Sequence, residues 1–158
     1  MKILVCVSVV PDTTTKITFT DDDTLFNRAG VQFIINPYDE LSLTRALEMT
    51  EANGGSVTVI TVGEAETEPV ISKALAMGAG DAIRIDASPK DGMYVAAQIA
   101  EQARAGEYDL VLTGRESIDY NGGQVQGLVA EMLGWPFINV AMELDAEGST
   151  INATRDID

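Results

Sequence analysis

The chain has 158 residues, of which 46% are hydrophobic and 22% are charged. This composition is that of an ordinary globular domain, and it excludes collagen, low-complexity sequence and wholesale disorder. The formal net charge is −15, so the field of the whole chain repels nucleic acids and anionic membrane surfaces.

The residue types that are absent or rare exclude several kinds of chemistry. The chain has no histidine, which removes Ser–His–Asp and Cys–His catalysis and histidine-ligated metal sites. The single cysteine, Cys6, can form neither an internal disulfide nor a cysteine-cluster metal site. Because Cys6 lies within an apolar run, we expect a buried and unreactive thiol. No nucleophile is paired with a base, so the sequence favours a protein without catalysis of its own.

The sequence shows no targeting segment. The apolar run that follows Lys2 is too short for the core of a signal peptide, and no run approaches the ~18 apolar residues of a membrane-spanning helix. We therefore expect a cytoplasmic protein.

The first predicted elements are a buried strand and an insertion. Residues 3–10 form a nearly continuous apolar run rich in valine, which predicts a strand buried on both faces of a parallel sheet. Residues 13–35 predict a small hairpin insertion. Its strands are expected at 16–20 and 31–35, with an acidic, solvated turn at 21–24 rather than a calcium site.

Helical and strand patterns alternate after the insertion. Apolar residues at helical spacing, with a glycine just after each C-terminal end, predict helices at 36–52, 67–77, 91–105 and 123–133. Short apolar runs between them predict strands at 57–62, 82–86, 109–114 and 137–141. This alternation predicts an α/β fold, an open parallel sheet with right-handed crossovers and helices on both faces. We expect strand order 3-2-1-4-5.

The end of the sequence has an unusual pattern. Residues 149–158 resemble the first half of a hairpin that has no second half. We therefore expect residues 1–158 to form a single domain that is truncated at its C-terminus.

The predicted topology places a binding site at one edge of the sheet. In open α/β sheets, ligands bind at the carboxyl ends of the strands, where the strand order reverses. Those ends belong here to residues 7–8, 62–63 and 113–114. The backbone after Cys6 could read an adenine edge or could simply end a strand. Asn36 lies near the same edge or caps the helix that it precedes.

The loop at 113–125 is the most suggestive segment, because it joins a buried strand to a helix. Gly122 and Gly123 allow the backbone to approach a ligand closely, and the start of the helix offers unpaired N–H groups to an anion. Gln124 could add a side-chain donor. Asp119 would sit badly beside a phosphate, so it either bonds a sugar hydroxyl or caps the helix. An ordinary strand-to-helix loop would have the same shape.

Four blocks of sequence resemble the beta subunit of electron transfer flavoproteins. They are residues 1–12, with Val-Pro-Asp after the strand; 36–40, Asn-Pro-Tyr-Asp-Glu; 74–79, Ala-Leu-Ala-Met-Gly-Ala; and 109–136, with Leu-Thr-Gly-Arg, Ser-Ile-Asp, Gly-Gln-Val and Leu-Gly-Trp-Pro. The resemblance covers essentially the whole chain. It implies a Rossmann-like fold with AMP bound in this subunit, and a partner alpha subunit that carries most of the redox FAD.

The resemblance also implies a function and a set of site residues. Electrons would come from acyl-CoA or other dehydrogenases and pass to a quinone oxidoreductase. In electron-bifurcating members, a second FAD takes the place of AMP. Tyr38 matches a position near the flavin of the other subunit. The positions that match nucleotide contacts are Cys6 and Val7 at the first strand end, Asn36, Val62, and the phosphate-binding segment Gly123, Gln124 and Val125 with Asp119 before it.

This sequence departs from the family pattern in two ways. Tyr120-Asn121-Gly122 stands where members commonly have Asp-Thr or Asp-Cys-Asn, which leaves the choice between AMP and FAD open. The family chain also continues further, into the loop that docks on dehydrogenases and the arm that wraps the alpha subunit. We therefore expect this chain to lack recognition of dehydrogenases and to pair poorly with its alpha subunit. Without the alpha subunit, uncovered apolar surface would allow self-association.

Two other classes have similar sheets. A nucleotide-binding regulatory module of the universal-stress-protein kind would have a longer glycine pattern after the fourth strand, where Arg115 to Asp119 stand here. An ATP pyrophosphatase would have a Ser-Gly-Gly loop after the first strand, where Val9 to Asp12 stand. The sequence disfavours both.

Overall fold

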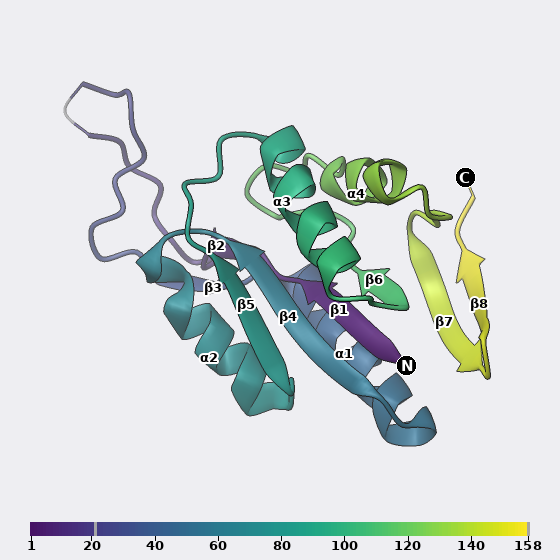
Figure 1. Cartoon of the computed structure of the whole chain (residues 1–158). Coiled ribbons are helices and arrows are strands. Elements are labelled where there is room, and N and C mark those ends of the chain that lie inside the picture. The colour runs from purple at the N-terminus through teal and green to yellow at the C-terminus, as the bar shows by residue number, and fades with distance from the viewer. Residues whose placement is uncertain (21, 158) are drawn as a thin grey trace.

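The computed structural model describes residues 1–20 and 22–157. Its centre is a parallel sheet of four strands in the order β5-β4-β1-β6 (Figure 1). These strands are β1 (Lys2–Cys6), β4 (Ser56–Val62), β5 (Asp81–Ile85) and β6 (Leu110–Leu112). Ile3 lies opposite Val57 on one side and Leu110 on the other, so β1 is central. The predicted α/β class and the 3-2-1-4 part of the predicted order are confirmed.

Helices cover both faces of this sheet (Figure 1). On one face lie α1 (Pro37–Asn53) and α2 (Glu68–Met77), which follows the short 3-10 helix η1 (Ala65–Thr67). On the other lie α3 (Gly92–Ala105) and α4 (Val125–Leu133). All four helices fall where the sequence predicts them, with ends within two residues.

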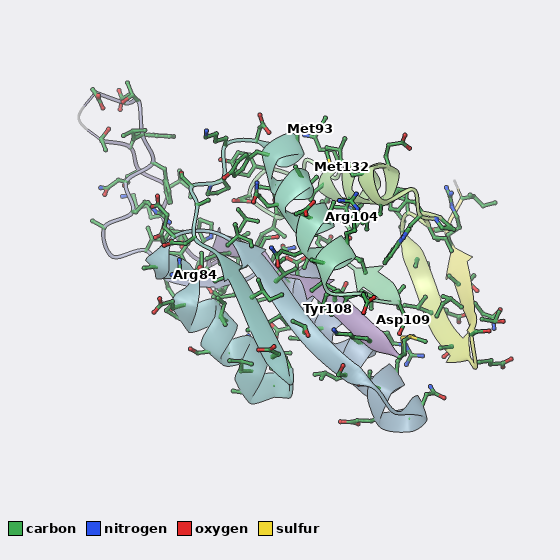
Figure 2. The ribbon with its side chains drawn as sticks, in the orientation of Figure 1. Arg84, Met93, Arg104, Tyr108, Asp109 and Met132 are labelled. Carbon is green, nitrogen blue, oxygen red and sulfur yellow. The ribbon has the colours of Figure 1, made fainter. Side chains whose placement is uncertain are left out.

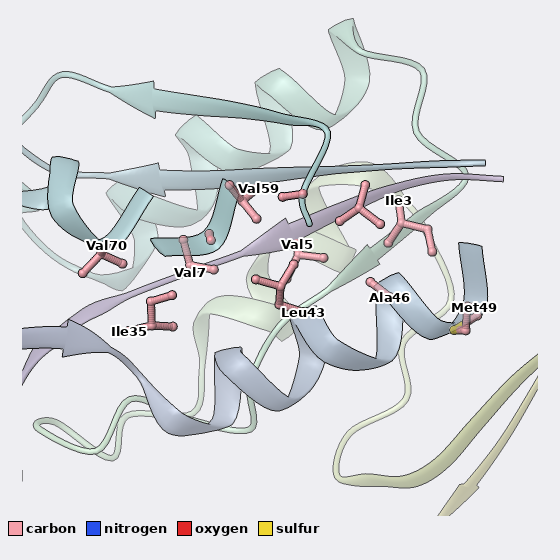
Figure 3. Close-up of a cluster of buried hydrophobic side chains, with 12 residues drawn as sticks. Ile3, Val5, Val7, Ile35, Leu43, Ala46, Met49, Val59 and Val70 are labelled. Carbon is pink, nitrogen blue, oxygen red and sulfur yellow. The ribbon is translucent and has the colours of Figure 1, made fainter. Parts of the chain in front are cut away.

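Side chains along β1 alternate between two cores. Ile3, Val5 and the following Val7 face α1 and α2, where they pack with Leu43 and Val70 (Figure 3). Leu4 and Cys6 point the other way, into a second core with α3 and α4. Burying an aliphatic side chain contributes about 1.5–3 kcal/mol, which is why a strand with two buried faces needs an unbroken apolar run.

The predicted pairing of strands 16–20 and 31–35 in the insertion is wrong. The strand expected at 31–35 is β3 (Phe33–Ile35), and it pairs antiparallel with β2 (Val9–Pro11) rather than with residues 16–20. The apolar run at 3–10 is thus two strands. Pro11 has no backbone N–H, which suits a short strand outside the main sheet.

A smaller ladder closes the tip of the insertion. Phe19 forms an antiparallel bridge with Phe26, flanked by backbone hydrogen bonds from Thr20 N to Leu25 O and from Asn27 N to Thr18 O. The predicted turn at 21–24 lies between them, although its first residue, Asp21, is outside the described residues. The insertion projects away from the sheet (Figure 1).

The predicted fifth strand of the main sheet is wrong. Instead of a strand at 137–141, the chain has β7 (Ala141–Glu147), which pairs antiparallel with β8 (Thr150–Arg155) in a separate hairpin. The C-terminal segment, predicted as the first strand of a hairpin, is therefore the second strand of this one. The sequence of β7 alternates apolar with acidic residues, whereas a buried parallel strand needs a continuous apolar run. Asp158 lies outside the described residues.

One consequence is a groove beside β6. In the described part of the chain, β6 has β1 as its only hydrogen-bonded strand neighbour. A groove of about 1340 Å³ runs between β6, α1, α4 and the β7–β8 hairpin. Leu41, Phe137, Ile138 and Met142 line it, each at least 47% exposed.

Polar contacts hold the amino end of β1, near which Tyr108 and Asp109 lie (Figure 2). Lys2 donates its backbone N–H to Asp109 Oδ2 at 2.7 Å, and its ammonium lies 4.7 Å from the ring centre of Tyr108. On the face covered by α3 and α4, the Arg104 guanidinium donates to the Met132 carbonyl at 2.8 Å and so joins the two helices. Within the described residues, no helix is both long enough and apolar enough to cross a membrane.

Candidate functional site

The candidate site lies at the carboxyl edge of the four-stranded sheet. Because β1, β4 and β6 are parallel neighbours, their carboxyl ends meet at one edge. Val62 ends β4, and Val7 and Thr113 directly follow β1 and β6, so all three lie on the same side of the sheet, as the predicted topology requires. Ligands of open α/β sheets bind at this edge.

The first strand ends with two buried side chains. Cys6 is 8% exposed, and burial is the largest cause that raises the pKa of its thiol, with the Asp39 charge second. Val7 is 4% exposed on the opposite face, and its N–H donates to the Ile60 carbonyl at 2.9 Å. Val62, at the end of β4, is half-buried against the α3 and α4 core. At these three positions, a ligand would meet backbone more than side chain.

Asn36 is fully buried and directs its amide toward the loop that follows β6. Its Nδ2 donates to the Glu116 carbonyl at 2.9 Å, and its Oδ1 accepts from Ile118 N at 3.2 Å. It occupies the N-cap position of α1 without a side-chain cap hydrogen bond. The side chain therefore shapes the loop, and direct contact with a nucleotide stays a prediction.

Asp39 is the residue whose role the sequence did not reveal. It is 4% exposed, and its carboxylate accepts hydrogen bonds from Ser8 N, Ser8 Oγ and Gly114 N at 2.7, 2.7 and 2.9 Å. Burial is the dominant cause that raises the pKa of this carboxyl, and the hydrogen bonds oppose it. A first-turn Asp also suits the helix dipole, so the sequence pattern offered no sign of this second role.

Tyr38 and Arg115, the sequence neighbours of Asp39 and Gly114, lie together. The Arg115 guanidinium is 5.4 Å from the ring centre of Tyr38, and it pairs with Glu116 at 2.6 Å. Glu116 also accepts from Asn121 Nδ2 at 3.2 Å, and these hydrogen bonds lower the pKa of the Glu116 carboxyl. The Arg115 side chain is half exposed, so the edge offers a cation and an aromatic ring to the solvent side.

The start of α4 is open for an anion. Gly123 adopts a left-handed φ of +58°, and Gln124 occupies the N-cap position without a side-chain cap hydrogen bond. The start of α3 is different, because Asp91 accepts from Tyr94 N at 2.7 Å there. The first N–H groups of α4, from Val125 onward, are thus left to solvent or to a ligand.

Two neighbouring side chains define the rim of this segment. Gln124 lies toward the start of α3, since a Cβ added at Gly92 would stand 3.3 Å from its Cγ. Asp119 is exposed and accepts from the backbone of Tyr120 at 2.9 Å, so it does not cap α4. A bond from Asp119 to a sugar hydroxyl stays a prediction.

The chain is similar to proteins of known family. The family model described as "Electron transfer flavoprotein domain" matches residues 23–158. An electron transfer flavoprotein subunit beta from Bacillus subtilis (strain 168) is 35% identical over 133 residues, which cover 82% of this chain and 52% of the relative. Another, from Bradyrhizobium diazoefficiens, is 31% identical over 163 residues, covering 100% of this chain and 64% of the relative.

A third relative has a more specific name. The "Acryloyl-CoA reductase electron transfer subunit gamma" of Anaerotignum propionicum is 33% identical over 162 residues, covering 98% of this chain and 60% of the relative. The chain thus spans between about half and two thirds of the length of these three relatives.

Proposed function

The chain belongs to the electron transfer flavoprotein family, and from this premise we propose that it acts as a beta subunit that binds AMP at the carboxyl edge of its sheet. In this proposal it pairs with an alpha subunit that holds most of the redox FAD. The complex carries electrons from dehydrogenases, such as those of acyl-CoA, to a quinone oxidoreductase. The chain itself turns over no substrate.

The observation that carries the AMP proposal is the open start of α4. The residue at its N-cap position makes no side-chain cap hydrogen bond, and α4 begins after the loop that leaves the carboxyl end of β6, the neighbour of β1. A net charge of −15 opposes a phosphate at long range, so local backbone dipoles must hold it. Gly123 supports this arrangement, because a Cβ there would have no neighbour closer than 3.8 Å and a ligand can approach the backbone.

Several residues would contribute to nucleotide binding. The backbone at Cys6 and Val7, with Val62 beside it, would flank the adenine, and Asp119 would bond a ribose hydroxyl. Gly123, Gln124 and Val125 would hold the phosphate. AMP reacts with nothing in this arrangement. It stabilises the fold by binding to the folded state alone.

The direct test is the identity of the nucleotide that the purified protein carries. The protein is denatured, the released small molecules are identified by mass spectrometry, and absorbance at 450 nm is recorded in parallel. AMP without flavin supports the proposal. FAD points instead to the bifurcating type, in which a second flavin takes this place. ATP would favour a regulatory nucleotide-binding module, and a protein that neither carries nor binds AMP contradicts the proposal.

A second part of the proposal concerns uncovered apolar surface. Leu41, Phe137, Ile138 and Met142 lie around the groove beside β6. Among the residues that the structure describes, β6 has a hydrogen-bonded strand neighbour on one side only. We propose that the chain self-associates through this surface when the alpha subunit is absent. Light scattering tests this: a monomer at all concentrations contradicts it.

A further inference from the structure

We propose that Asp39 is a positioning residue that sets where the phosphate-binding segment stands relative to the end of β1. The inference rests on the proposed nucleotide site and adds to it a buried residue that touches no nucleotide. The carboxylate bridges two strand ends. Oδ2 accepts from both donors of Ser8, after β1, and Oδ1 accepts from Gly114 N, after β6.

The second argument is that α1 holds the whole first half of the loop. Besides Asp39, Asn36 binds Glu116 O and Ile118 N, and Ser42 Oγ donates to the Thr113 carbonyl at 2.8 Å. The segment from Thr113 to Ile118 is therefore docked on the first turns of α1. The rest of the loop leads directly to the start of α4, so the position of the phosphate-binding segment depends on this docking.

The third argument is the tight fit at Gly114. A Cβ on this residue would overlap Asp39 Oδ1 and stand 2.8 Å from the Asp39 backbone nitrogen. The loop thus leaves β6 in direct contact with α1, with no space for a side chain between them. The ladder between β1 and β6 ends at the pair Val5–Leu112. Beyond it, each oxygen of one rigid carboxylate holds one chain, so Asp39 ties Ser8 to Gly114 where the strands no longer do.

The chemistry requires a carboxylate at this position. All three partners donate, and an ionised carboxylate only accepts, whereas an amide would turn an NH₂ group toward Ser8 or Gly114. In the described chain, no salt bridge includes Asp39. Its charge is supported by these donors and by the start of the helix on which it lies.

The test compares AMP with adenosine, which lacks the phosphate. Calorimetry measures the affinity of both for the wild type and for the Asp39→Asn variant. If Asp39 positions the phosphate-binding segment, the variant loses affinity for AMP by about tenfold or more, while affinity for adenosine changes far less. The preference for AMP over adenosine therefore shrinks.

A matched control separates positioning from general stability. Ala46 is fully buried on the same helix but has no hydrogen bond to the loop, so Ala46→Gly destabilises α1 without touching the docked segment. We expect this variant to keep the wild-type preference for AMP even where its melting temperature falls as far as that of Asp39→Asn. If Asp39→Asn fails to fold, Ser8→Ala, which removes one of the three donors, is expected to reduce the preference by a smaller factor.

The outcomes distinguish the two proposals. A wild type that binds AMP no better than adenosine overturns the phosphate site, and the role of Asp39 with it. If the wild type prefers AMP and Asp39→Asn keeps the same preference, the phosphate site stands and the positioning role is overturned. The same conclusion follows from Ser8→Ala if that variant has to replace Asp39→Asn. Equal loss of preference in Ala46→Gly also overturns it.

Discussion

Replacing Gly114 by alanine tests the tight junction between β6 and α1. The new Cβ would overlap Asp39 Oδ1 and stand 2.7 Å from Tyr38 Cβ and 2.8 Å from Asp39 N. Tyr38 Cβ and Asp39 N are fixed by the backbone of α1 and cannot rotate away, so the loop or α1 must move. Overpacking of this kind costs about 1–3 kcal/mol, and losing the hydrogen bond from Gly114 N to a carboxylate costs about 1.5–3 kcal/mol.

These two effects together predict a loss of roughly 2.5–6 kcal/mol in the free energy of unfolding. For a domain of this size, the melting temperature would fall by roughly 5–24 °C. Urea denaturation followed by circular dichroism measures the first quantity, and calorimetry measures the second.

Gly122 is the matched control, because it lies in the same loop and a Cβ there would have no neighbour closer than 4.0 Å. Gly122→Ala is expected to stay within about 0.5 kcal/mol of the wild type. If Gly114→Ala is equally mild, the junction is loose and the reasoning about the docked loop is refuted.

Three further predictions concern the carboxyl edge. Changing Gly123 to Asp and Gln124 to Ala together should abolish AMP binding in titration calorimetry and leave the far-UV circular dichroism spectrum intact, because added negative charge opposes phosphate; unchanged binding would remove the phosphate assignment. Burial raises the pKa of the Cys6 thiol, so a thiol reagent should react with the native protein far more slowly than with the urea-unfolded chain, and rapid native reaction would contradict the buried position. Burial also raises the pKa of Asp39, so the folded state binds its proton more tightly than the unfolded state does. Relative to Asp39→Asn, the wild type should therefore gain free energy of unfolding as the pH falls through this raised pKa toward about 3.9, the ordinary pKa of the unfolded chain. That gain should be lost as the pH rises again. Denaturation at several pH values measures this difference, and an increase toward neutral pH would contradict the sign.

The sequence predicted the elements whose patterns are strong. Each helix has an apolar stripe and a glycine near its end, and the strands β1, β4 and β6 are apolar runs because both faces are buried. Such signals are local. They do not depend on which strand becomes a neighbour.

Pairing was the weaker part of the prediction, because it depends on residues far away in the sequence. The run at 3–10 contains no break, yet Ser8 is held by Asp39 and Asn36, and the chain leaves the main sheet there. Residues 137–141 look strand-like in isolation. Val140 has a positive φ of 52°, however, and the strand that follows has acidic residues on its exposed face.

The candidate site shows the same limit. The open start of α4 and the three strand ends follow from the order of elements, so the sequence could place them. The roles of Asn36 and Asp39 could not be seen, because their partners lie up to 82 residues away and become neighbours only in the folded chain.

The central position of β1 has a consequence for the order in which the protein is made. Its partner on one side, β4, ends at Val62, but its partner on the other side, β6, ends at Leu112. At the usual rate of about 5–20 residues per second, the ribosome needs roughly 5–20 seconds to proceed from Cys6 to the end of β6. During that time an apolar strand with one free edge is exposed in the cell. A nascent chain of this protein is therefore expected to bind chaperones until β6 emerges, and to release them soon after.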